Sequence, residues 1–96
     1  MSEPRRIVVD VLKPHDPSLV AFTQHVTDAV SVASASATLL EHDKEVQNVE
    51  IAVDGEALDY GAVEAAIEDL GGTVHSIDHV ACGEEVLPER PADERR

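Results

Sequence analysis

Aliphatic residues recur along the chain in short runs, and the spacing within each run predicts one kind of element. Residues 6–12 form an almost continuous β-branched run that stops at Lys13 and Pro14, which predicts a buried strand. Residues 32–39 and 46–53 alternate apolar and polar positions with a period of two, which predicts two strands with one packed face each. The polar residues 41–45 between them predict a hairpin loop. Residues 73–80 predict a fourth strand.

Two other segments have the spacing of helices. The first carries one apolar stripe: Leu19, Phe22, Val26 and Val30. We expect this helix to begin with Asp16 as its N-cap and Pro17 as its first residue, and to end near Ala29. The second carries the stripe Val63, Ala66, Ile67 and Leu70. We expect Asp59 to cap it and the pair Gly71-Gly72 to supply a positive φ at its end.

The order strand, helix, strand, strand, helix, strand predicts an α+β fold. It is the ferredoxin-like βαββαβ sandwich, with an antiparallel sheet in the order 4-1-3-2 and both helices on one face. We expect residues 1–83 to form this domain, because a chain of 96 residues has no room for a second core. Residues 84–96 are rich in Glu, Pro, Arg and Asp, which predicts a disordered acidic tail.

Twenty acidic residues against seven basic ones give a formal net charge of -13. A field of this sign repels nucleic-acid phosphates and anionic membranes, so we expect neither as a partner. No apolar run approaches the ~18 residues of a membrane span, and residues 1–6 lack the apolar core of a signal peptide, so we expect a cytoplasmic location. The single cysteine, Cys82, excludes a disulfide within one chain.

The acidic residues are spread along the whole chain, whereas lysine occurs only as Lys13 and Lys44. This distribution is typical of a halophilic, haloarchaeon-like protein, because hydrated carboxylates keep a surface soluble in molar salt, where the Debye length falls to ~3 Å. The alternative is a local acidic patch with a function. The even spread favours adaptation to salt.

Side chains with metal-ligand chemistry converge in the predicted topology. The end of the first strand, the 41–45 hairpin and the start of the fourth strand meet at one edge of the sheet. The candidate metal ligands at this edge are His15, Asp16, His42, Asp43, Glu45 and His75. Carboxylates favour calcium, magnesium or manganese, and imidazoles favour zinc or nickel. The alternative is a helix cap, a packed histidine and an ordinary polar turn, since no established metal motif is present.

Asp10 stands in the middle of an otherwise apolar central strand. If its neighbours Val9 and Val11 point to the helices, Asp10 lies on the open face of the sheet, near Glu50 of the third strand and Ser76 or Asp78 of the fourth. An unpaired buried carboxylate is costly, so Asp10 should pair or bind a ligand. The alternative is a hydrogen bond to hydroxyls, or to Arg6 across an oligomer contact.

The turn at Lys13 is a second candidate for ligand binding. A lysine before the N-terminus of a helix can hold an anion, although Asp16 repels one there, and a purely architectural turn is the alternative. The candidate ligand-binding residues are therefore Asp10, Lys13, Ser76 and Asp78.

Several functional classes lack their defining residues. The chain has no glycine-rich phosphate loop, no aromatic residue on the central strands for RNA stacking, and no cysteine pair in the first loop for metal transfer. We interpret the chain as a non-enzymatic binding or regulatory module. An open sheet face and a core with one Phe and one Tyr favour a homo-oligomer.

The expected ligand is a small molecule or a divalent cation: calcium, magnesium, manganese or zinc. No catalytic residue is assigned. The alternatives are a small enzyme with carboxylate acid–base chemistry near Asp10 and Asp78, and a purely structural subunit of an oligomer.

Four collinear segments carry a resemblance to a known family: residues 9–17 (Val-Asp-Val-Leu-Lys-Pro-His-Asp-Pro), 48–51 (Asn-Val-Glu-Ile), 59–60 (Asp-Tyr) and 70–78 (Leu-Gly-Gly-Thr-Val-His-Ser-Ile-Asp). Together they resemble the archaeal family of uncharacterised small proteins known as domain of unknown function 211, over roughly residues 5–83. The resemblance implies a ferredoxin-like fold and ring-shaped homo-oligomers, and it implies no reaction. Ala35 and Ala37 depart from it, because larger aliphatic side chains are expected there.

Salt should stabilise this protein. At low ionic strength its negative charges repel one another across a Debye length of ~30 Å, which shrinks to ~3 Å at 1 M. We expect the thermal midpoint to rise steadily from ~0.05 to ~2 M sodium chloride. A flat or falling series would mean that the acidic residues serve binding instead.

Overall fold

The computed structural model describes residues 3–84 of the 96-residue chain. Its elements follow in the order β1 (Pro4–Pro14), α1 (Leu19–Thr27), β2 (Ser34–His42), β3 (Val46–Asp54), α2 (Tyr60–Asp69) and β4 (Thr73–Cys82). The predicted order of strands and helices is therefore confirmed. The tail predicted for residues 84–96 lies outside the described residues, apart from Glu84.

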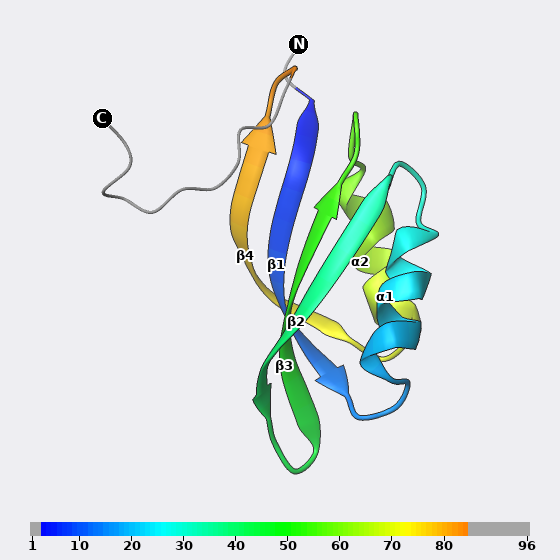
Figure 1. Ribbon diagram of the computed structural model, residues 1–96, viewed down its shortest axis with the longest axis vertical. Helices are drawn as coiled ribbons and strands as arrows, with labels where there is room; N and C mark the ends of the chain where they lie inside the picture. The colour runs from blue at the N-terminus through cyan, green and yellow to red at the C-terminus, as the bar shows by residue number, and fades with distance from the viewer. Residues whose placement is uncertain (1–2, 85–96) are drawn as a thin grey trace, which may run out of the picture.

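The strands form one antiparallel sheet in the order β2-β3-β1-β4, which is the predicted ferredoxin-like arrangement read from the other edge. Both helices lie on the same side of this sheet (Figure 1). Within residues 3–84, no helix covers the other side, which we call the open face. Neither α1 nor α2 has the length and apolar character that a membrane crossing requires.

The core lies between the helices and the inner face of the sheet. Ile7, Val9 and Val11 of β1 are almost fully buried there, as their alternation predicts. The remaining core is aliphatic apart from one aromatic ring: Phe22, Val26, Val49, Ile51, Val53, Leu58, Val63 and Ile67. Because residues 7, 9 and 11 face inward, the residues between them face the open side.

The two ends of α1 differ from the prediction. Ser18, rather than Asp16, is the N-cap, and its Oγ accepts a hydrogen bond from the Ala21 N–H at 3.1 Å. A cap needs extended backbone directly before the first helical turn, and Ser18 has it, with ψ at 163°. Asp16 and Pro17 therefore precede the helix.

Val30, which was predicted to belong to the buried stripe of α1, lies beyond the helix and is 73% exposed. The helix ends at Thr27 because the chain then turns towards Ser31, whose φ of +81° no helix allows. The limits of α2 are as predicted. Asp59 caps it through the Ala62 N–H, and Gly71 follows it with a φ of +86°.

The hairpin between β2 and β3 is tighter than predicted. The register of the pair shifts between Leu39 and Glu41, and β2 then continues to His42. The connecting loop is therefore 43–45 instead of 41–45. A shift of this kind inserts one extra residue and changes the face on which the next side chains lie, so Glu41 comes to be paired with Asn48.

The pairing of β4 with β1 has three shifts, and two of them lie near the middle of the strands, between Val8 and Val9 and between Asp10 and Val11. The β4 residues that are passed over at these shifts are Asp78 and His75, while Ser76 between them is paired with Asp10. A β-bulge changes the direction in which nearby side chains point. These two bulges do so for Asp78 and His75.

Candidate functional site

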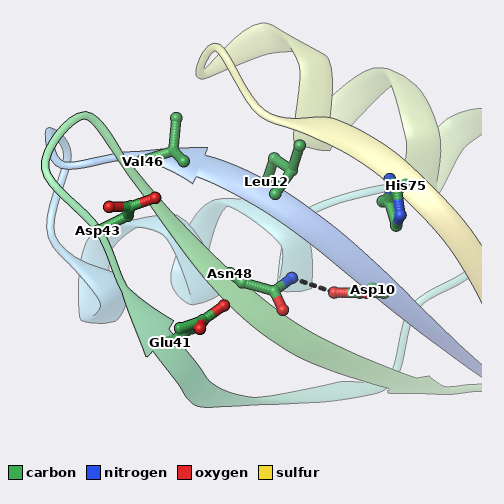
Figure 2. A pocket seen from close by; sticks show the side chains of 7 residues that line it. All are labelled: Asp10, Leu12, Glu41, Asp43, Val46, Asn48 and His75. Carbon is green, nitrogen blue, oxygen red and sulfur yellow. Dashed lines mark hydrogen bonds between the residues drawn. The ribbon is translucent and has the colours of Figure 1, made fainter.

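A hollow of about 170 Å³ lies on the open face, at the end of the sheet near the 43–45 hairpin (Figure 2). Side chains from all four strands and the hairpin line it: Asp10, Leu12, Glu41, Asp43, Val46, Asn48 and His75. Asp10 and Leu12 are successive outward residues of β1, and Leu12 is paired with Asn48 of β3. The shift in β2 brings Glu41 to this face, and the bulge in β4 brings His75.

Asp10 has its hydrogen-bond partner within the chain. Asn48 Nδ2 donates to Asp10 Oδ1, as Figure 2 shows, and also lies 3.3 Å from the Val11 carbonyl oxygen. Arg6, which we considered as a partner across an oligomer contact, pairs its Nε with Asp54 Oδ1 at 2.7 Å. The half-buried carboxylate of Asp10 is thus fixed by a neutral amide, which supplies no opposite charge.

The sequence alone did not single out two polar residues of this site: Glu41, which it placed only in the hairpin loop, and Asn48. Asn48 occupies an outward position of β3, two residues before Glu50. A short amide at one of the polar positions of this alternating strand was the available signal. The register sets Asn48 opposite Leu12 and beside Asp10. Only this placement shows that the Asn48 amide holds the Asp10 carboxylate.

The predicted neighbours of Asp10 are confirmed on both sides. Glu50 is its direct partner in β3, and Ser76 is its direct partner in β4. Ser76 Oγ donates a hydrogen bond to Asp78 Oδ1 at 2.7 Å. The Asp78 carboxylate is therefore held by a residue of its own strand, β4. The structure therefore brings three of the four candidate ligand-binding residues to one part of the sheet: Asp10, Ser76 and Asp78.

Lys13, the fourth of these candidates, lies on the opposite side of the sheet and is completely buried. Its Nζ donates to the Pro14 carbonyl oxygen at 2.9 Å and to Gln47 Oε1 at 3.0 Å, and lies 5.7 Å from the centre of the Phe22 ring. Burial lowers the pKa of Lys13, and the nearby charge of Asp16 opposes this shift. The ammonium group thus ties the end of β1 to the hairpin.

The six candidate metal ligands divide into separate groups. Asp43 and His75 line the hollow. His15 and His42 pack edge to face at the hairpin, with ring centroids 4.6 Å apart, and His15 Nε2 lies 2.7 Å from the Asp43 carbonyl oxygen. Asp16 and Glu45 are exposed on the loops beside them. Within residues 3–84, no group of three or more His, Cys, Asp or Glu side chains is arranged to hold a metal ion directly.

The lining of the hollow is polar and mostly acidic. Three carboxylates, an amide and an imidazole face it together with the aliphatic side chains of Leu12 and Val46. The lining contains no hydroxyl, thiol or amine that could act as a nucleophile. Carboxylate and amide oxygens are ligands of hard cations.

The fold defines a small ferredoxin-like α+β domain whose polar hollow lies on the open face of its sheet. Residues 5–96 match the family domain of unknown function 211, described as "Uncharacterized ArCR", and the chain belongs to this family. An uncharacterised protein of Methanocaldococcus jannaschii, MJ0319, is 40% identical over 85 residues, which cover 88% of each chain. The family resemblance found in the sequence is thus confirmed, and neither name assigns an activity.

The buried Lys13 should make stability depend on alkaline pH. Because its pKa in the native protein is below the ordinary 10.5, native Lys13 loses its proton at a lower pH than unfolded Lys13. The unfolded state then binds more protons, so the free energy of unfolding should rise as pH increases towards 10.5. Urea unfolding of the parent and of Lys13→Met at constant high salt measures this, and only the parent should show the rise.

Tyr60 changes the free energy of unfolding in the opposite direction at alkaline pH, so its contribution must be removed from the comparison. Burial raises its pKa above 10.0, with Glu64 and Glu68 adding to the shift, so its contribution to stability is lost above that pH. Both proteins are therefore compared in a Tyr60→Phe background, with Lys44→Met as the matched exposed lysine. Equal pH profiles for the parent and Lys13→Met would contradict the effect assigned to burial.

Proposed function

We propose that this protein is a non-enzymatic binding module that takes a divalent cation in the hollow beside Asp10. The observation that carries the proposal is the convergence of three carboxylates from separate segments, Asp10, Glu41 and Asp43, on one hollow. Asn48 adds an amide oxygen, which suits calcium, magnesium and manganese. His75 adds an imidazole, which manganese and zinc accept.

The dimensions of the hollow favour an ion that keeps part of its hydration shell. A volume of about 170 Å³ is larger than a bare ion, and the carboxylates surround the hollow instead of forming a closed cage. Magnesium commonly retains several waters and is held through one or two carboxylates. Glu41 is exposed, so its side chain is free to turn towards such an ion. Asp43 Oδ1 accepts a hydrogen bond from the Lys44 N–H at 2.8 Å, which leaves Oδ2 available to the ion.

A divalent cation that binds here should raise the unfolding midpoint. It binds the native state alone, and at a hundred times the dissociation constant it stabilises by about 2.7 kcal/mol. Calcium, magnesium, manganese and zinc are compared by thermal unfolding at constant ionic strength, so that general screening of the acidic surface is held fixed. We expect Asp43→Asn and Asp10→Asn to reduce the metal-induced increment.

Further substitutions distinguish a metal site in the hollow from the metal site that the sequence predicted at the edge of the sheet. His15→Ala and Glu45→Gln alter candidate ligands that do not line the hollow, and they should leave the increment unchanged. His75→Ala should reduce the response to manganese and zinc more than that to calcium. If all four metals merely follow ionic strength in every variant, the hollow holds no cation.

We also propose that the protein self-associates through the edges of its sheet. β2 and β4 are the two edge strands, and both expose aliphatic side chains: Leu39, Leu40, Ile77 and Val80. Edge strands also offer unpaired backbone groups. Contact between two open faces is disfavoured, because it would bring Asp10 and Glu50 of one copy against the same residues of another. Pairing of β2 of one copy with β4 of the next, repeated, generates a ring where the rotation between successive copies closes.

Self-association should be visible as mass in solution. Light scattering in about 2 M salt, where repulsion is screened, should give a multiple of the 10.3 kDa chain mass. Ile77→Lys and Leu39→Lys place a charge on each edge and should shift the mass towards that of one chain. Val30→Lys, at a more exposed position outside the edge strands, is the control. A single species of 10.3 kDa in the parent protein rules the assembly out.

A further inference from the structure

The open face carries a second hollow at the opposite end from the hairpin. It measures about 300 Å³ and is lined by Arg6, Val8, Ser36, Glu50, Ala52 and Asp54. The register places it directly beyond the first hollow, because Asp10 lines the first, Glu50 lines the second, and these two residues are paired across β1 and β3. The two hollows together run along the central strands.

The pairing of Asp10 with Glu50 is electrostatically unfavourable in the isolated domain. Like charges directly opposite one another on neighbouring strands destabilise a sheet. Glu50 is paired on its other side with Thr38 of β2, and Asp10 is paired on its other side with Ser76 of β4. Both of these neighbours are neutral hydroxyl residues. Arg6, the one arginine or lysine that lines these hollows, is already paired with Asp54 at 2.7 Å. A cationic occupant would relieve this repulsion.

The negative charge of the face extends over both hollows. Five carboxylates and one guanidinium line them: Asp10, Glu41, Asp43, Glu50, Asp54 and Arg6. Aliphatic contacts are present as well, from Val8, Leu12 and Val46, while Ser36 and Ala52 are small enough to let another backbone approach closely. The face therefore combines negative charge with limited apolar area along one line.

We propose that the open face docks a basic amphipathic helix of a partner protein. Elements that cover the face of a sheet are typically helices, whereas strands add at its edges. From Arg6 to Leu12 the strand extends about 20 Å, at ~3.3 Å per residue, which matches a helix of about 14 residues. Lysine and arginine side chains of that helix complement the carboxylates, and a second copy of this acidic chain does not. The inference goes beyond the cation site and stands without it, because the second hollow shares none of its lining residues.

The test uses the whole protein and a labelled peptide of about 14 residues with lysine and leucine at helical spacing. Binding is followed by fluorescence anisotropy in about 0.5 M sodium chloride, which screens the general charge of the protein, and in the presence of EDTA, which removes divalent cations. We expect saturable binding that Glu50→Gln weakens about five- to tenfold. The same peptide with every lysine replaced by glutamate should not bind.

Glu68→Gln is the matched control, because it removes the same charge from an exposed position on α2, on the helical side of the molecule. Its affinity for the peptide should stay within about twofold of the parent protein. Equal weakening by both substitutions would show that only net charge is sensed, and it would overturn the proposal. Failure of the lysine peptide to saturate the parent protein would overturn it too. Since EDTA is present throughout, neither result depends on whether the first hollow binds a metal.

Discussion

The alternation of side chains along β1 is the constraint on which the rest of this structure depends. β1 is hydrogen-bonded to β3 on one side and to β4 on the other, and both helices of the described residues 3–84 cover the same face of the sheet. A slip of one residue would turn Asp10 into the apolar core and expose Val9 and Val11. The cost of burying a carboxylate there fixes the register. It also fixes which residues of β3 and β4 stand beside Asp10, and hence the composition of the open face.

Departures from regular alternation shape the site on that face. The shift in β2 brings Glu41 beside Asn48, and the bulges in β4 set His75 and Asp78 apart from the regular pairs. The consequence is a hollow whose charged lining comes from several segments, with Asn48 holding Asp10 in place. On the other face, Lys13 ties β1 to the hairpin through neutral oxygens. The hairpin that carries Asp43 is thereby anchored from the side that the hollow does not occupy.

Much of the fold followed from the sequence, because its signals are local. Period-two and helical spacing placed the strands and α2, and the roles of Asp59 and Gly71 were recognisable from residue type. The start of α1 could not be recognised from residue type, because Asp16 and Ser18 are both favourable N-cap residues and only the backbone conformation distinguishes them. The site was predicted in part. Asp43, His75 and Asp10 were singled out, but bulges leave no clear signature, so neither the separation of His15 and His42 from the hollow nor the burial of Lys13 could be read from spacing.

The central claim is that the hollow beside Asp10 receives a cation, while the many other carboxylates of this protein merely carry charge. Paramagnetic broadening by manganese measures this most directly, because it reports the position of the ion residue by residue. In the nitrogen-15 spectrum at high salt, the amide signals of Asp10, Asp43, Asn48 and His75 should lose intensity first and together, at a manganese level that leaves Glu64 and Glu68 of α2 unchanged. Broadening that spreads evenly over the acidic surface, or that begins on α2, would contradict the claim.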